Sequence, residues 1–355
     1  MKVVLALGAA LILLTACGSA PVADVPPAPE AAPTSRATPL RRPSSSPEPP
    51  AGVDSQRLAT GFETLAASYP GELALAVVPV GGGDPLVFGS VTEPVAWSTI
   101  KVPISIAALR NDTRGRLEPT MRAAITWSDN GSAMKLYSSL GRTAQAQNAV
   151  DQVLHDLGDP NTSLIKSSVN FGEATWELHD QARFAAQLPC HPDAQAVYEA
   201  MDDVIEEQSW GLGIFPGAHF KGGWGISDRG TLVRQLGVIE TAKGNVAVAV
   251  AYDSDDSDVV GFVALTEVAQ WLAANADALP VGQCPGATPR PEAATTAPLR
   301  TWTPEPTIEE PEPATTAPRS TRSTTRPSSS KPSTRKPATP TRRATAQPSA
   351  RSTKG

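Results

Sequence analysis

Residues 121–133 read MRAAITWSDNGSA, and this stretch says most about the fold. Its apolar residues have helical spacing, and a second helical pattern follows over Ser132–Leu140. The triplet Ser128-Asp129-Asn130 therefore lies in a short loop between two predicted helices. Such a triplet can be no more than a helix N-cap, or it can hold chemical groups at a cleft. Its companions elsewhere in the chain decide between these interpretations.

A second motif, Ser98-Thr99-Ile100-Lys101, opens another predicted helix. A hydroxyl in the first helical turn lies near unsatisfied N–H groups, which favour developing negative charge. Lys101 falls on the same helix face as Ser98, adjacent to its Oγ. Ile100 and Val102 indicate burial, which lowers the pKa of a lysine. We therefore expect a neutral Lys101 amine to accept the proton of a Ser98 nucleophile.

The remaining polar residues have separate expected roles. Ser128 can relay a proton to a leaving nitrogen, since a hydroxyl both donates and accepts. The carboxamide of Asn130 can hold Lys101 and a substrate amide together. Lys221 supplies a fixed positive charge for Ser128 and for a substrate carboxylate.

A third motif, Lys221-Gly222-Gly223, lies on a predicted strand. Gly223 permits close backbone approach, and the N–H of Trp224 with that of Ser98 is expected to form an oxyanion hole. Each motif alone occurs readily by chance, as a helix start, a cap or a turn. Their order and their placement on predicted elements together favour a catalytic site over coincidence.

The segment around these motifs predicts an α+β domain over residues 51–285. Strands are expected over Glu72–Val80, Leu86–Val91, His219–Gly223, Gly230–Thr241 and Asn245–Tyr252. Helices are expected over Asp54–Tyr69, Ser98–Arg110, Pro119–Trp127, Ser132–Leu140, Thr143–Leu157, His179–Leu188, Pro192–Gln208 and Val259–Ala276. We predict one antiparallel five-stranded sheet flanked by terminal helices (residues 51–97 and 209–285), plus an all-helical lobe (98–208). Clefts between lobes are where ligand sites tend to lie.

With its three motifs, the chain resembles the class A β-lactamase and penicillin-interacting serine enzyme superfamily. The likeness covers roughly residues 54–277 and is closest over 121–133. It implies an α/β lobe with a five-stranded antiparallel sheet and an all-helical lobe. It also implies catalytic roles for Ser98, Lys101 and Ser128, and substrate-binding roles for Asn130, Lys221, Gly223 and Trp224. Neither a cofactor nor a metal is expected, because the Cys and His residues lack metal-ligand spacing.

The sequence departs from this superfamily at three places. One is the distance from Ser98 to Ser128, since 30 residues is short for the family. Class A enzymes carry a Glu-x-x-Leu-Asn loop whose Glu activates the deacylating water, but residues 165–171 contain no carboxylate. Glu173 is the nearest substitute, and it more readily caps the following segment. Loss of a positioned base lowers deacylation by about 10²–10⁴-fold. Gly222 also stands where the resemblance places a hydroxyl that binds the substrate carboxylate.

Three functions follow from these observations. The first is a serine enzyme acylated on Ser98 by β-lactams or peptidoglycan-derived D-alanyl-type peptides, with slow or no deacylation. The second is an active β-lactamase that uses Glu173 or another non-standard base. The third is a non-catalytic envelope module that retains the fold and binds wall fragments or a partner.

The N-terminus predicts export. Lys2 precedes an apolar run that ends in Leu-Thr-Ala-Cys17, which resembles the bacterial lipobox. We expect residues 1–16 to be a lipoprotein signal peptide and Cys17 to carry the lipid, which anchors the protein on the outer face of the cell membrane. The alternative is an ordinary secretory signal with an incidental cysteine.

Two arms flank the predicted domain. Of 35 prolines, 10 lie in residues 18–50 and 13 in residues 286–355. Residues 17–50 are expected to form a disordered tether and residues 286–355 a disordered basic tail. The tail is either a solvated spacer or binds anionic wall polymers. The domain itself carries 14 basic and 28 acidic residues, which argues against nucleic acid as its partner.

Two further cysteines, Cys190 and Cys284, remain in the predicted domain. In an exported protein an even remainder favours a disulfide, here one that closes a long loop, over two free thiols.

Overall fold

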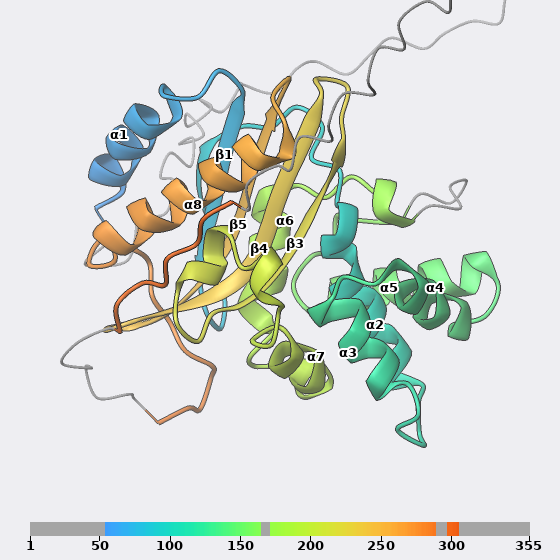
Figure 1. The fold of residues 1–355 in the computed structure, drawn as a ribbon. Helices are drawn as coiled ribbons and strands as arrows, with labels where there is room; N and C mark the ends of the chain where they lie inside the picture. The colour runs from blue at the N-terminus through green and yellow to red at the C-terminus, as the bar shows by residue number, and fades with distance from the viewer. Residues whose placement is uncertain (1–53, 165–170, 289–296, 305–355) are drawn as a thin grey trace, which may run out of the picture.

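A computed structural model of the chain describes residues 54–164, 171–288 and 297–304. At its centre is one five-stranded antiparallel sheet with the strand order β2-β1-β5-β4-β3 (Figure 1). The strands are β1 (Glu72–Pro79), β2 (Leu86–Gly89), β3 (His219–Ile226), β4 (Thr231–Thr241) and β5 (Gly244–Ser254). Because β1 pairs with β5, both ends of the domain complete one sheet, and the predicted fold class is confirmed.

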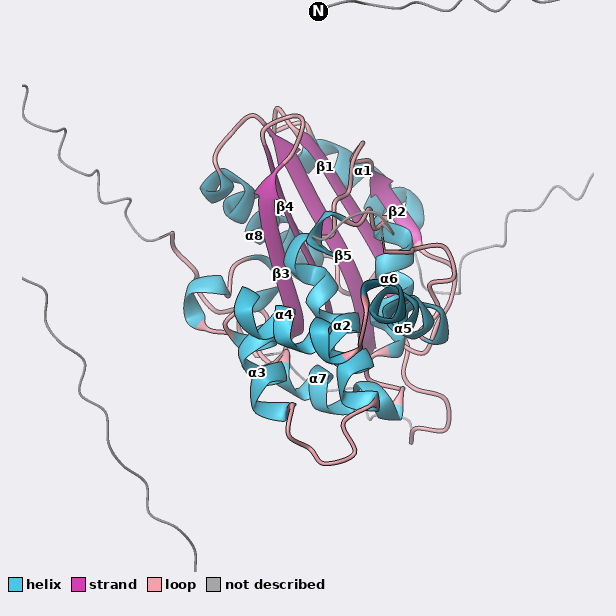
Figure 2. Ribbon diagram, turned by 90° about the vertical axis from the view of Figure 1, so that its right-hand side faces the viewer, coloured by secondary structure: helices cyan, strands magenta, loops and turns pink. Residues whose placement is uncertain are grey.

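Helices cover both faces of the sheet. One face carries α1 (Ser55–Ala66) and α8 (Asp258–Ala274), and α6 (Leu178–Gln187) crosses the other (Figures 1 and 2). The remaining helices gather beyond α6 and β3: α2 (Lys101–Arg110), α3 (Glu118–Thr126), α4 (Asn130–Ser139), α5 (Thr143–Asp156) and α7 (Gln195–Ala200). Short 3₁₀ turns join them: η1 (Trp97–Ile100), η2 (Phe171–Glu173), η3 (Pro192–Ala194), η4 (Glu206–Gln208) and η5 (Gly211–Ile214).

The two-sided cover explains the sequence of β1. Residues 73–78 are all buried, because alternate side chains enter different cores. Ala74 and Ala76 pack toward the helical group, whereas Leu73 and Leu75 pack toward α1 and α8. A strand covered on both faces therefore reads as a continuous apolar run.

Helix α2 is enclosed on every side. All of its residues from Lys101 to Ala108 are buried, and it contacts α3, α4, α5 and α7. Lys101 is the first residue of α2, so the burial of this helix also places Lys101 in the interior.

One predicted helix is wrong. Pro192–Gln208 does not form one helix: η3 is followed by α7, which ends at Ala200, and Glu206–Gln208 is a separate 3₁₀ turn. Tertiary hydrogen bonds redirect the chain. The N–H of Phe220 donates to Met201 O, and the N–H of Ile205 donates to Thr126 O.

Cys190 and Cys284 form a disulfide, as predicted, with their Cα atoms 5.2 Å apart. The bridge ties the end of α6 to the segment after α8. Part of the C-terminal arm departs from the expected spacer: residues 297–304 lie against the domain, where the N–H of Arg300 donates to Ile214 O at 2.7 Å.

Several predictions fall outside the described residues: the signal peptide 1–16, lipidation of Cys17, the tether 17–50, and the loop 165–170. Most of the basic tail also lies outside them. Among the helices that are described, none has the length and apolar character needed to cross a bilayer.

Candidate active site

The turn η1 places Ser98 against the edge strand β3. Gly223 makes this contact possible, since a Cβ at this position would lie 2.6 Å from the backbone N of Ser98. Gly225 does the same for the preceding residue, because its Cβ would lie 2.6 Å from Cζ2 of Trp97. The two glycines therefore let the Ser98 turn pack flat on the strand, and the expected close approach at Gly223 is present.

Backbone strain coincides with this site. Trp97, directly before Ser98, has φ 47°, and Ser128 has φ 56°. Among the described non-glycine residues only these two have positive φ. Such conformations cost about 1–3 kcal/mol each and collect at functional sites. The strain thus falls on one motif serine, Ser128, and on the residue directly before the other, Ser98.

Lys101 connects the turn of Ser98 to the loop of Ser128. Its Nζ donates to Ser128 O at 2.5 Å, to Asn130 Oδ1 at 2.7 Å and to Ser128 Oγ at 3.1 Å. Burial lowers the pKa of Lys101 to about 8, and the nearby Asp129 carboxylate only partly opposes this shift. A substantial fraction of the amine is therefore neutral near physiological pH, as a proton acceptor requires.

The expected hydrogen bond between Ser98 and Lys101, both of which the structure describes, is absent, and this part of the prediction is wrong. Within the described residues, no hydrogen bond joins Ser98 Oγ to Lys101 Nζ. The amine instead forms hydrogen bonds with Ser128, in the segment that joins α3 to α4, and with Asn130, the first residue of α4. Asn130 thus holds Lys101, as predicted, through its carboxamide oxygen.

Lys221 approaches the same hydroxyl from the sheet side. Its Nζ donates to Ser128 Oγ at 2.9 Å and to Gly222 O at 2.7 Å. The side chain is fully buried, and burial, with the charge of Lys101 as a second cause, lowers the pKa of Lys221. Ser128 Oγ therefore lies between two buried amines, one from each lobe.

Asp129 fixes the geometry of this loop. Its Oδ1 accepts from the N–H of Ser132 at 2.6 Å and caps the N-terminus of α4. Hydrogen bonds from Ser132 lower the pKa of Asp129. The middle residue of the Ser-Asp-Asn triplet is thus a helix cap, and its two neighbours form hydrogen bonds with Lys101 and Lys221.

The indole of Trp210 accounts for the glycine at position 222. A Cβ on Gly222 would lie 2.9 Å from Cζ2 of the buried Trp210. Trp210 belongs to an aromatic cluster behind β3, stacked on Phe262 at 4.5 Å and edge-on to Trp224 at 6.0 Å between ring centroids. A hydroxyl-bearing side chain at position 222 therefore requires this cluster to move.

A buried polar network of Arg234, Gln181 and Thr99 supports the Ser98 turn, and it was not predicted from the sequence. Arg234 on β4 is fully buried and donates to Trp176 O at 2.8 Å and to Gln181 Oε1 at 2.7 Å. Gln181 Nε2 in turn donates to Thr99 Oγ1 at 3.0 Å. Burial lowers the pKa of Arg234 to about 9. The available signal was a charged residue, Arg234, in the middle of a predicted strand with apolar residues on both sides of Arg234-Gln235.

Glu173, the proposed substitute base, is exposed at the end of η2. The neighbouring loop 165–170, which lacks a carboxylate in the sequence, lies outside the described residues.

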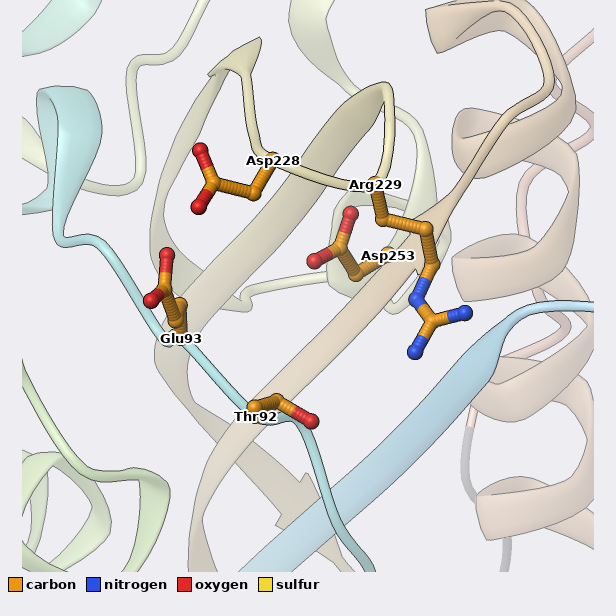
Figure 3. Close-up of a pocket in the computed structure, with 5 residues that line it drawn as sticks. All are labelled: Thr92, Glu93, Asp228, Arg229 and Asp253. Carbon is orange, nitrogen blue, oxygen red and sulfur yellow. The ribbon is translucent and has the colours of Figure 1, made fainter.

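Away from these residues, a hollow of about 360 Å³ lies at the turn between β3 and β4. It is lined by Thr92, Glu93, Asp228, Arg229 and Asp253 (Figure 3). Asp253 is buried and accepts from Ser227 Oγ at 2.5 Å, and burial raises the pKa of Asp253. The described residues contain no group of His, Cys, Asp and Glu able to hold a metal ion.

No protein-family model and no curated protein matches the chain. Solved structures do. A β-lactamase from Streptosporangium roseum is similar with a TM-score of 0.51 and 16% identity, over 62% of this chain and 99% of that one. The TLA-3 extended-spectrum β-lactamase is similar with a TM-score of 0.50 and 15% identity, over 61% and 99%.

A variant of the class A β-lactamase of the last common ancestor of Gram-negative bacteria is also similar, with a TM-score of 0.50 and 18% identity, over 61% of this chain and 97% of that one. The chain therefore has the fold of the class A β-lactamases, as its motifs predicted. The likeness is one of fold.

Proposed function

We propose that this protein is a serine enzyme that β-lactams or D-alanyl-type peptides acylate on Ser98, and that it releases the acyl group slowly. The observation that carries the proposal is the hydrogen-bonded set Lys101, Ser128 and Lys221 beside the strained Ser98 turn. Apolar residues would pack this region at least as well as two buried amines around one hydroxyl. The amines therefore indicate a chemical role.

Acylation begins with attack of Ser98 Oγ on the carbonyl carbon of the substrate. The Ser98 proton passes to the neutral Lys101 amine as the C–O bond forms. For this the amine must first release a contact with Ser128 or Asn130 and turn toward Ser98 Oγ. The developing oxyanion accepts hydrogen bonds from the N–H groups of Ser98 and Trp224. Collapse of the tetrahedral intermediate breaks the C–N bond, and the leaving nitrogen takes a proton from Ser128, which recovers one from Lys101 or Lys221. The acyl-enzyme then holds an ester at Ser98.

Deacylation needs a base that activates water. Residues 165–171 contain neither Asp nor Glu, and the nearest carboxylate in sequence is the exposed Glu173. Without a positioned base the ester persists, because general-base catalysis of this step contributes about 10²–10⁴-fold.

Intact-protein mass spectrometry after incubation with a panel of β-lactams tests the proposal. A covalent adduct on the wild type, absent from Ser98→Ala and stable for many minutes, is the expected result. The absence of an adduct with every compound would reject it and favour the non-catalytic module. Steady nitrocefin turnover that is lost in Glu173→Ala would instead identify an active β-lactamase.

The same proposal places the protein in the cell envelope, held by a lipid on Cys17 with the domain outside the membrane. Support comes from the sequence Leu-Thr-Ala-Cys after an apolar run. A Cys17→Ala variant is expected to leave the membrane fraction, and its full retention there would contradict lipid anchoring. Adhesion of the basic tail to anionic wall polymers predicts that truncation at Gly286 weakens wall retention at low salt.

A further inference from the structure

The C-terminal strap, residues 297–304, adds a wall to the surface of the domain. Its backbone is fixed by the hydrogen bond from Arg300 to Ile214 O, and the Trp302 indole meets Phe262 edge to face with ring centroids 6.3 Å apart. Figure 1 shows the strap as the orange-red segment that runs beside α8. Trp302 is only half-buried there, so part of its ring surface stays open.

A hollow of about 900 Å³ lies between the strap and the domain. Its other walls are the segment 204–213 and the first turn of α8. The lining residues are Val204, Glu206, Glu207, Ser209, Gly213, Val259, Phe262, Arg300, Thr301, Trp302, Thr303 and Pro304. This volume lies within the range of pockets that hold small ligands.

The lining combines three kinds of group. Trp302 and Phe262 offer aromatic surface. Glu206, Glu207 and Arg300 offer charged hydrogen-bonding groups, and none of these three forms an ion pair with another described residue. Hydroxyl groups of the strap and of the segment 204–213 complete the wall. A matching ligand presents flat apolar C–H faces together with many hydroxyl donors and acceptors.

We propose that this hollow binds a chain of pyranose sugars. The aromatic rings contact the C–H face of a sugar ring, Glu206 and Glu207 accept from its hydroxyls, and Arg300 donates to its oxygens. A polyanion is disfavoured by the two carboxylates. An apolar ligand would leave the charged groups without water or partners, at a high desolvation cost.

The position of the hollow relates it to the cleft. The segment 204–209 separates the hollow from the Ser128 loop: Ile205 N–H donates to Thr126 O, and Gln208 Nε2 donates to Trp127 O, both at 3.2 Å. A bound sugar chain thus lies one short segment away from the Ser128 loop. Sugar binding does not depend on acylation, and the two are measured separately.

Titration of the mature chain with chitotetraose and with cellotetraose, followed by calorimetry, tests the proposal. Saturable binding is expected for at least one of them. Trp302→Ala should weaken it by about tenfold, the loss expected for one aromatic contact. Trp127→Ala is the matched control, because this indole is 64% exposed but lies outside the hollow, and its affinity should equal that of the wild type.

Trp302→Ala could weaken binding merely because the strap detaches from the domain. A double variant, Glu206→Gln with Glu207→Gln, tests the hollow without this problem, since the amides keep the shape of the wall. This variant should also bind more weakly, with an unchanged circular dichroism spectrum. No binding of either sugar at millimolar concentration overturns the proposal, as does equal affinity in all variants. Binding of a sugar-free muropeptide stem or of heparin at this hollow, in place of the neutral sugars, overturns it too. Labelling of Ser98 in the same samples reports the acylation proposal independently.

Discussion

Lys101 and Lys221 donate to one atom, the hydroxyl oxygen of Ser128, at 3.1 and 2.9 Å. A hydroxyl oxygen has two lone pairs and one proton. It accepts from both amines when both are charged, and it can donate to one of them when that amine is neutral. Because burial lowers both pKa values, the second arrangement gains weight near neutral pH, and Ser128 becomes a proton path between the two lobes.

The pH dependence of acylation follows from the lowered pKa of Lys101, about 8. Only the neutral amine accepts the proton of Ser98, and its fraction grows as the pH rises toward the pKa. The second-order rate of labelling by a fluorescent penicillin should therefore rise by about tenfold from pH 6 to pH 7 and level off above pH 8. A rate that is constant or falls over this range contradicts Lys101 as the base. Lys101→Arg, which stays charged, should label at a negligible rate at every pH.

Strain at Ser128 predicts opposite behaviour of two small substitutions. Both Ser128→Ala and Ser128→Gly remove the hydroxyl and should slow acylation to a similar degree. Only glycine adopts φ 56° without strain, so the glycine variant should unfold with a free energy about 1 kcal/mol higher than the alanine variant. Urea denaturation measures this difference. Equal stability of the two variants would show that the loop carries no strain.

Gly223→Ala should disable the site. The added Cβ would lie 2.6 Å from the backbone N of Ser98 and 3.0 Å from that of Thr99, so the Ser98 turn must move. We expect a loss of stability of about 1–3 kcal/mol and a fall in labelling of Ser98 below detection. Gly131→Ala is the control on the same cleft: its Cβ has 3.4 Å to the nearest atom, and alanine suits a helix better. Normal labelling of Gly223→Ala would disprove the close contact between β3 and η1.

The disulfide predicts a redox-dependent stability. The bridge between Cys190 and Cys284 spans 94 residues and includes β3, β4 and β5. Its removal by Cys190→Ala with Cys284→Ala should lower the free energy of unfolding by about 2–4 kcal/mol. Dithiothreitol should lower the melting temperature of the wild type and leave that of the double variant unchanged. A wild type insensitive to the reductant argues that the thiols are not bridged.

Asp253 predicts a stability that falls with rising pH. Burial raises its pKa in the folded state, so its charged form is less favourable there than in the unfolded chain. This contribution is absent below the ordinary pKa of about 4 and is complete above the raised one. Asp253→Asn should therefore melt at a higher temperature than the wild type at pH 7, with the difference vanishing near about pH 3. Asp84→Asn serves as control and should change little, because Asp84 is exposed and is not among the charges that shift the pKa of Asp253. A variant less stable at pH 7 would show that the carboxylate is favourably placed.

Much of the fold could be predicted from the sequence because its signals were local. The run in β1, the turn after Thr241 and the cap at Asp129 each fix an element within a few residues. The end of α7 at Ala200 could not be predicted, because distant groups determine it: Thr126 and Phe220 pull the chain out of the helix.

In the candidate site, too, features set by local sequence could be predicted and features set by distant residues could not. The motifs singled out Ser98 and Lys101 by their spacing on one predicted helix, and Ser128 by the Ser-Asp-Asn triplet between two others. The hydrogen-bond partners of each amine depend on tertiary contacts, so the bond from Lys101 to Ser128 O could not be predicted from sequence spacing. The same is true of the bonds that join Thr99 to Gln181 and Gln181 to Arg234.

The contact between Gly222 and Trp210 constrains how this cleft can change over generations. A threonine or serine introduced at position 222 meets the indole at 2.9 Å and loses stability before it gains any new hydrogen bond. A smaller residue at position 210 must arise first, and alone it leaves a cavity beside Phe262. Each single substitution is therefore expected to destabilise the protein, so positions 210 and 222 can change only together.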